Sequence, residues 1–220
     1  MLRRFFRMVI RGLFQILTRF EVQGLDHIPP EGGALIAVNH LSRLDPPAIF
    51  AVIERDDLSA LVADKYKSHL LIRPVVEYVK GIWIHREDTD FRALRQATEY
   101  LQNGGILGIA PEGTRSSSRG LIAAKTGVAY LADKAGVPVI PVAIAGTDRI
   151  FQAWGKLRRP KVVLRFGEPF RLPPLDRKNR AAQLQENTDE IMLRIAAMLP
   201  EEYRGVYAAD PRLKAYSVFY

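Results

Sequence analysis

The sequence predicts an α/β fold in which a largely parallel central sheet is flanked by helices. Short apolar runs bounded by Gly or Pro, such as residues 34–38, are typical of buried strands. Longer amphipathic segments with the helical period separate these runs. Because strands and helices alternate along the chain, the pattern indicates βαβ units and parallel strand pairing. The 220 residues, 48% of them hydrophobic, suffice for one such domain.

Residues 1–20 are predicted to be a membrane-associating segment built on one amphipathic helix over residues 2–20. One face of its helical wheel carries the arginines, which are Arg3, Arg4, Arg7, Arg11 and Arg19. Leu, Ile and Phe side chains cover the rest, and a wide apolar face beside a basic one is typical of a helix in the membrane interface. Arginines interrupt every apolar run, which argues against a transmembrane span. The alternative is a surface helix packed on the domain.

Residues 21–200 are predicted to form the α/β domain, and residues 201–220 a C-terminal tail. The expected strands cover residues 34–38, 59–63, 81–86, 105–110, 137–146 and 161–166. The expected helices cover residues 46–53, 66–79, 89–102, 125–134 and 177–198. Pro74 is expected to bend or break the second helix. The tail is either poorly ordered or a packed extension.

Charge and composition narrow the classes of function. The net charge is +8, and a basic excess suits nucleic acid, an anionic membrane surface or anionic substrates. The basic residues are not interleaved with aromatic ones, so no nucleic-acid partner is predicted. The absence of cysteine excludes disulfides and a thiol nucleophile. The four histidines, at positions 27, 40, 69 and 85, lack ligand spacing, so no metal site is predicted.

A basic run lies between residues 156 and 180, where the only acidic residues are Glu168 and Asp176. The run comprises Lys156, Arg158, Arg159, Lys161, Arg165, Arg171, Arg177, Lys178 and Arg180. Such a run is usually a solvated face. The alternative is a patch for lipid headgroups, for the phosphates of a CoA or for an acidic carrier protein.

The strongest candidate for a functional site is the stretch NHLSRLDPP at residues 39–47. It follows the expected strand 34–38, so His40 stands at the C-terminal end of a strand, where open α/β sheets bind ligands. Asp45 precedes Pro46, and this order predicts a helix start. The corner brings the two side chains together, so that the carboxylate can hold Nδ1–H and leave Nε2 as a base. The alternative is a purely structural His–Asp pair.

Two further strand ends are expected on the same edge of the sheet. Residues 81–86 end in Arg86, and residues 105–110 open into Glu112, Gly113, Thr114 and Arg115. Gly113 permits close backbone approach to a ligand, Thr114 offers a hydroxyl, and the two arginines can form forks on a phosphate. A base beside an anion clamp predicts activation of a hydroxyl on a phosphate-bearing substrate.

Four motifs in this order resemble the glycerolipid acyltransferase family, which includes the 1-acyl-sn-glycerol-3-phosphate (lysophosphatidic acid) acyltransferases. Residues 39–45 resemble its catalytic His-x4-Asp block. Residues 81–86, GIWIHR, are similar to a second block ending in a substrate-contacting arginine, and residues 111–116, PEGTRS, to a third that holds the phosphate side of the acceptor. Residues 137–142, VPVIPV, resemble the fourth, an apolar strand. His85 stands where many members carry an acidic or small residue, and no role is assigned to it.

The resemblance implies an enzyme in which His40 and Asp45 are catalytic. It implies a substrate-binding set of Asn39, Arg86, Glu112, Gly113, Thr114 and Arg115. His40 takes the proton from the free hydroxyl of lysophosphatidic acid, whose oxygen attacks an acyl thioester to give phosphatidic acid. Acyl-CoA or an acyl-carrier protein is the expected co-substrate, with no cofactor. The expected location is the cytoplasmic face of a membrane, as a peripheral or monotopic protein held by residues 1–20.

Three alternatives remain open on the sequence alone. An enzyme of the same fold can acylate another lyso-lipid, for example a lyso-ornithine lipid. A hydrolase can direct water to the same thioester or ester, with Ser42 as a candidate nucleophile. A non-catalytic membrane-binding or nucleic-acid-binding module is suggested by charge alone.

Overall fold

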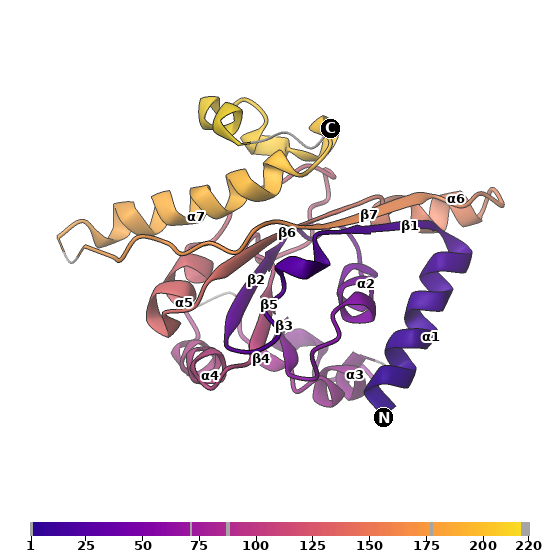
Figure 1. Cartoon of the computed structure of the whole chain (residues 1–220), viewed down its shortest axis with the longest axis horizontal. Coiled ribbons are helices and arrows are strands. Elements are labelled where there is room, and N and C mark those ends of the chain that lie inside the picture. The colour runs from indigo at the N-terminus through magenta and orange to yellow at the C-terminus, as the bar shows by residue number, and fades with distance from the viewer. Residues whose placement is uncertain (1, 71, 87–88, 177, 217–220) are drawn as a thin grey trace.

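The computed structural model of the protein describes residues 2–70, 72–86, 89–176 and 178–216 (Figure 1). Its strands form one sheet in the order β1-β7-β6-β2-β5-β3-β4. They are β1 (Arg19–Gln23), β2 (Ala34–Val38), β3 (Leu58–Ala63), β4 (Ile82–Ile84), β5 (Ile106–Ile109), β6 (Val139–Ala145) and β7 (Lys161–Phe166). The β6–β7 pair is antiparallel and the other neighbouring pairs are parallel. The predicted α/β class with a largely parallel sheet is confirmed.

Helices cover both faces of this sheet (Figure 1). They are α1 (Leu2–Leu17), α2 (Asp45–Val52), α3 (Ile72–Tyr78), α4 (Phe91–Gln102), α5 (Gly127–Ala135), α6 (Ile150–Trp154) and α7 (Arg180–Ala197). The central strand β2 divides the core, because alternate side chains of a strand point to opposite faces. Leu35 and Ala37 join the cluster beneath α4, α5 and α7, whereas Ile36 and Val38 join the cluster beneath α1 and α2. No helix in the described part of the chain is both long and apolar enough to cross a bilayer.

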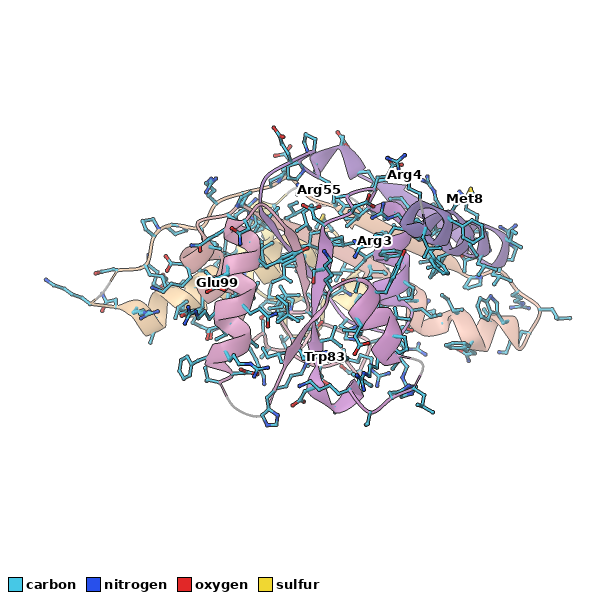
Figure 2. The ribbon with its side chains drawn as sticks, turned by 90° about the horizontal axis from the view of Figure 1, so that it is seen from below. Arg3, Arg4, Met8, Arg55, Trp83 and Glu99 are labelled. Atoms are coloured by element: carbon cyan, nitrogen blue, oxygen red, sulfur yellow. The ribbon has the colours of Figure 1, made fainter. Side chains whose placement is uncertain are left out.

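The amphipathic helix α1 packs on the domain through part of its arginine face. Arg7 is buried and donates hydrogen bonds to the carbonyls of Glu54 and Arg55, just beyond the C-terminal end of α2. Arg3 donates to the carbonyls of Asp56 and Tyr78. Figure 2 shows Arg3 turned toward the domain and Met8 on the outer side of the helix. The apolar face is left exposed: Leu2, Phe5, Phe6, Met8, Val9, Leu13, Ile16 and Leu17.

The helix predicted over residues 2–20 ends at Leu17, three residues early. Thr18 closes its last turn by donating both its amide and its hydroxyl to the carbonyl of Phe14. The Arg19 amide then donates to the carbonyl of Pro160, and β1 pairs in parallel with β7 from that point. The boundary predicted at residue 20 therefore falls inside β1. The helix ends early because residues 19–23 pair with β7, which is distant in the sequence.

The helix predicted over residues 66–79 is also shorter than expected. A 3-10 turn, Asp64–Tyr66, comes first, and α3 covers only Ile72–Tyr78, with residue 71 outside the described residues. Pro74 is the reason, because its ring cannot follow a preceding helical turn and is tolerated only near a helix start. The predicted start of the last helix at Arg177 lies outside the described residues, and α7 is described from Arg180.

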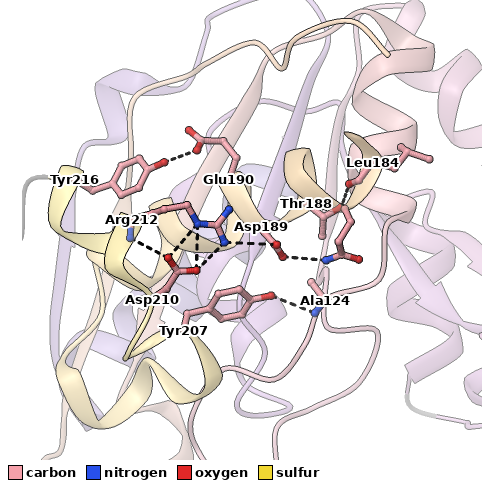
Figure 3. Close-up of polar contacts among 10 residues, drawn as sticks. Ala124, Leu184, Thr188, Asp189, Glu190, Tyr207, Asp210, Arg212 and Tyr216 are labelled. Atoms are coloured by element: carbon pink, nitrogen blue, oxygen red, sulfur yellow. Dashed lines mark hydrogen bonds and ion pairs between the residues drawn. The ribbon is translucent and has the colours of Figure 1, made fainter. Parts of the chain in front are cut away.

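The C-terminal segment is a packed extension over the residues described, up to Tyr216; residues 217–220 of the predicted tail lie outside them. Tyr207 and Leu213 join the core beside α7. Figure 3 shows the polar contacts, in which Arg212 binds Asp210 and Asp189. The Tyr207 hydroxyl accepts a hydrogen bond from the Ala124 amide at 3.4 Å. Residues 201–216 therefore cover α7 and the chain segment that follows β5.

Candidate active site

His40 and Asp45 meet at the corner where β2 ends and α2 begins, as the sequence predicts. His40 Nδ1 lies 2.8 Å from Asp45 Oδ2. The imidazole is 18% exposed and the carboxylate 2%. Asp45 is the first residue of α2, with proline following it, so the carboxylate sits at the positive end of the helix dipole. The predicted pairing is confirmed in geometry.

Asp45 is held by more than the imidazole. Its Oδ2 also accepts hydrogen bonds from the amides of Leu41 and Ser42, each at 2.7 Å. Its Oδ1 accepts one from the Thr147 hydroxyl at 2.6 Å. All of these groups donate, so the Asp45 carboxylate is the acceptor of each hydrogen bond. A carboxylate acceptor at this position binds the Nδ1–H tautomer of His40, which leaves Nε2 without a proton and able to take one.

The backbone of His40 is fixed by the loop that follows β5. The His40 amide donates to Glu112 Oε1 at 2.9 Å, and the His40 carbonyl accepts from the Ser116 amide at 2.9 Å. Glu112 Oε2 accepts from the Ile122 amide at 3.1 Å. Burial raises the pKa of Glu112, while the two amide hydrogen bonds oppose that rise. The Glu112 side chain is 2% exposed and both of its oxygens are occupied.

Two members of the predicted substrate-binding set therefore support the site from within. Glu112 braces the His40 backbone, and its predicted contact with substrate stays a prediction. Asn39 is fully buried, with Nδ2 donating to the Ile144 carbonyl at 2.9 Å and Oδ1 accepting from the Ile144 amide at 2.8 Å. A primary amide matches both groups of one peptide, so Asn39 joins the end of β2 to β6.

Arg86 and Gly113 come together although their strands are not neighbours. The β4 strand lies at the edge of the sheet, two places from β5. The long side chain of Arg86 spans this gap, and its NH1 donates to the Gly113 carbonyl at 2.8 Å. Lys125 Nζ donates in turn to the Arg86 carbonyl at 2.9 Å. Burial lowers the pKa of Arg86, which has no carboxylate partner among the described residues.

Thr114 and Arg115 are exposed on the same loop. Gly113 precedes them with a φ of +69°, a conformation that a side chain rarely adopts. No ion pair holds the Arg115 guanidinium within the described ranges. The loop therefore presents an exposed hydroxyl and an exposed guanidinium, and it contacts the His40 backbone through Glu112 and Ser116.

Sequence reasoning missed the residues that complete this arrangement. Thr147 follows β6 and its glycine, Gly146, and its position at the end of a predicted strand was the signal that could have found it. Gly205, from the C-terminal segment, packs against Gly120, and the Val206 amide donates to the Leu121 carbonyl at 3.0 Å. No local sequence pattern predicts that contact, because it joins segments far apart in the chain.

Ser42, the nucleophile of the alternative hydrolase, is engaged in the same corner. Its amide donates to Asp45, and its hydroxyl accepts a hydrogen bond from the Leu44 amide at 3.2 Å. The side chain is buried. This placement gives Ser42 the role of a turn residue.

Residues 19–145 match the family model described as Acyltransferase. The chain belongs to this family. The matched range contains His40, Asp45, Arg86 and the loop 112–115. This confirms the family that the four motifs resemble.

The related proteins are consistent in their names. The chain is 28% identical over 137 residues to the chloroplastic 1-acyl-sn-glycerol-3-phosphate acyltransferase BAT2 of Brassica napus, covering 59% of this chain and 38% of that protein. It is 35% identical over 96 residues to the 1-acyl-sn-glycerol-3-phosphate acyltransferase of Escherichia coli K12, covering 42% and 37%. Against the first three curated relatives, the chain spans between 37% and 52% of their length.

A solved structure shares the fold. The crystal structure of the 1-acyl-sn-glycerophosphate (LPA) acyltransferase PlsC from Thermotoga maritima matches with a TM-score of 0.63 and 26% sequence identity. The match covers 86% of this chain and 77% of that one.

Proposed function

We propose that this protein transfers a fatty acyl group from an acyl thioester to the free hydroxyl of 1-acyl-sn-glycerol-3-phosphate, giving phosphatidic acid. The observation that carries the proposal is the hydrogen bond between Nδ1 of His40 and the buried carboxylate of Asp45. Family membership and the names of the relatives support the substrate class. Acyl-CoA or an acyl-carrier protein serves as the donor, without a cofactor.

His40 acts first as base and then as acid. Its Nε2 takes the proton of the acceptor hydroxyl while the oxygen attacks the thioester carbonyl carbon. The ionised Asp45 stabilises the imidazolium that forms. The carbon–sulfur bond then breaks, and the departing thiolate takes the proton from Nε2. The products are an ester and a free thiol, and His40 returns to its starting state.

Arg86, Thr114 and Arg115 bind the acceptor phosphate in this proposal. Arg86 uses one nitrogen on the Gly113 carbonyl, which fixes the plane of a guanidinium that has further donors. Arg115 is exposed two residues after Gly113 and can form a second fork on the phosphate. We expect Arg115→Ala to raise KM for lysophosphatidic acid by about tenfold, the effect of losing one charge-assisted contact.

We also propose that α1 holds the enzyme at a membrane surface. Its apolar face is exposed because Arg3 and Arg7 bond the domain instead. Deleting the helix is a poor test, since Phe14 belongs to the core. Replacing the exposed Phe5 and Leu13 with Asp leaves the core contacts intact and should weaken binding to vesicles.

The reaction is tested by thiol release in the presence of different acceptors. The protein contains no cysteine, so a thiol reagent reports only the released donor thiol. We expect release with lysophosphatidic acid, little without acceptor, and less with lyso-ornithine lipid. Equal release without acceptor would indicate a hydrolase. Faster release with lyso-ornithine lipid would overturn the assignment of the acceptor.

A further inference from the structure

A basic groove lies beside α6, with a volume of about 510 Å³. It is formed by the starts of β1 and β7, the end of β6 and the α6 segment. Its cations are Arg19, Arg149, Lys156, Arg158, Arg159 and Lys161. Glu202 is the one carboxylate among the described residues that line it. Cations gathered around one hollow repel each other, so the groove favours an anionic ligand.

The groove bears on whether the basic run between residues 156 and 180 is a solvated face or an anion-binding patch. The start of the run converges on the groove together with Arg19 and Arg149, through Lys156, Arg158, Arg159 and Lys161. Later members point elsewhere: Arg165 is buried and donates to the Met198 carbonyl, and Arg171 donates to the Gly136 carbonyl. The run is therefore not one solvated face, and its first part forms a concave surface.

Some of these cations build the groove and others are left for a ligand. Arg159 donates to the carbonyls of Gln15 and Thr18, and Lys161 pairs with Glu21 at 2.9 Å. Lys156 and Arg158 are exposed and have no ion-pair partner in the described ranges. These two side chains are the ones that a bound anion would engage.

An exposed apolar side chain stands between those two cations. Leu157 is 98% exposed and has a φ of 51°, in the left-handed region that disfavours branched side chains. Phe151, on α6, is 64% exposed and packs edge-on against Trp154. An exposed leucine side chain is unfavourable in water, whereas an apolar phase beside the groove would accept it.

The α6 segment is fastened to the helix proposed to lie on the membrane. Trp154 Nε1 donates to the Leu17 carbonyl at 2.9 Å, at the C-terminal end of α1. Ile16 and Leu17 are exposed on that last turn of α1. Both elements lie at the same end of the molecule in Figure 1. Apolar side chains of α1 and of residues 150–157 therefore belong to neighbouring elements with a fixed relation.

We propose that residues 150–161 and their groove form a second membrane contact, which binds the phosphate of an anionic phospholipid headgroup. Lys156 and Arg158 engage the phosphate while Leu157 and Phe151 enter the apolar layer below it. Ala145 and Gly146 line the groove, and Thr147, the next residue, bonds Asp45. The contact therefore lies beside the candidate active site. It does not depend on the proposed reaction, because it is measured without substrates.

Vesicle co-sedimentation of the full chain tests the charge. We expect Lys156→Glu/Arg158→Glu to reduce the partition coefficient on vesicles containing phosphatidylglycerol by about 30-fold or more, the effect of two lost interfacial cations. Binding to pure phosphatidylcholine vesicles should change little. Lys134→Glu/Lys178→Glu is the matched control, with the same charge change on exposed side chains off the groove. It should bind within about threefold of the unmodified protein, since distant charges are screened.

Leu157→Gly tests the apolar part and keeps the fold. Glycine adopts a φ of 51° freely, so the melting temperature should be equal or higher. Binding to both kinds of vesicle should fall by about tenfold. Lower binding with preserved melting separates a lost membrane contact from misfolding. Unchanged binding in this variant would overturn the apolar part of the proposal.

Other occupants give different results, each of which would overturn the proposal. Unchanged vesicle binding with a raised KM for acyl-CoA or acyl-carrier protein in Lys156→Glu/Arg158→Glu would assign the groove to the donor. Unchanged vesicle binding with loss of inorganic-phosphate binding by calorimetry would assign it to a free anion. Thiol release with detergent-dispersed lysophosphatidic acid should stay normal in the variant, so failure of the membrane contact is distinguishable from failure of the reaction.

Discussion

Two His–Asp pairs of nearly equal length lie in very different surroundings within the part of the chain that the structure describes. His40 Nδ1 lies 2.8 Å from Asp45, and His85 Nδ1 lies 2.9 Å from Asp64. In the first pair the side chains are 18% and 2% exposed, and in the second they are 47% and 34% exposed. Asp45 is also bonded by two backbone amides and by Thr147. Distance alone does not distinguish the pairs, whereas burial does.

The difference teaches what makes a histidine useful as a base. A buried carboxylate that is held by several hydrogen-bond donors fixes one tautomer and one orientation of the histidine ring. Little reorganisation is then needed when the ring takes up a proton. A solvent-exposed pair is screened and contributes little. The same comparison orders the expected effects of mutation, because each additional support of the buried pair can be removed singly.

The largest effect on turnover is expected from replacing His40, with the same replacement of His85 as the comparison. His40→Ala should lower turnover by about 10²–10⁴-fold, the usual contribution of a general base. His85→Ala should stay within about threefold, since its pair is exposed. Thiol release with saturating lysophosphatidic acid measures both. Similar losses in the two variants would remove the distinction between the pairs.

The charge of Asp45 is expected to matter next. Asp45→Asn keeps the shape of the side chain but loses the charge that stabilises the imidazolium, so turnover should fall by about 100-fold. Asp64→Asn is the control and should be nearly silent. Circular dichroism and melting temperature should confirm that Asp45→Asn remains folded. Full activity in that variant would mean that the proton transfer does not use this carboxylate.

Thr147 should give a smaller loss, because it supports the carboxylate from the far side. Thr147→Val keeps the volume and removes the hydroxyl that donates to Asp45 Oδ1 at 2.6 Å. We expect about a tenfold fall in turnover, in line with the loss of one hydrogen bond to a buried charge. Thr147→Ser restores the donor and should recover most of the rate. Failure of serine to rescue would point to packing and not to the hydrogen bond.

The smallest effect is expected in the pH dependence of stability at Glu112. Burial raises the pKa of this carboxyl above its ordinary value of 4.5, so the folded state binds the proton more tightly than the unfolded state. The free energy of unfolding of the natural protein, relative to Glu112→Gln, should therefore rise as the pH falls from 7 towards 4.5. Denaturant titration at both pH values measures it. A difference of the opposite sign would contradict the burial of Glu112.

The central part of the fold could be predicted because its signals are local. The run at residues 34–38 gives β2 with the predicted bounds, and residues 161–166 give β7. The sequence also places His40, Asp45 and the loop 112–115 on one edge of the sheet, because parallel strands end together. The edge strand β1 was harder to predict, because it pairs with β7, which lies more than a hundred residues away in the chain.

The division of labour within the site could not be predicted from residue type. Asn39 and Glu112 look like ligand-binding residues in the sequence, yet in the structure their side chains form hydrogen bonds with the peptide groups of Ile144, His40 and Ile122. Thr147 was overlooked because its role depends on β6 lying next to β2. In the same way, the arginines of α1 look like a solvent face, and two of them instead bond the domain.

The central claim is that Asp45 holds His40 with Nε2 free to accept a proton, and the tautomer of its ring tests this directly. The measurement is a ¹⁵N NMR spectrum of protein labelled at its four histidines, with His40 assigned through the His40→Ala variant. Above the pH at which the ring is protonated, Nδ1 should carry the proton and Nε2 should show the shift of an unprotonated nitrogen. A neutral His40 with its proton on Nε2 would contradict the account.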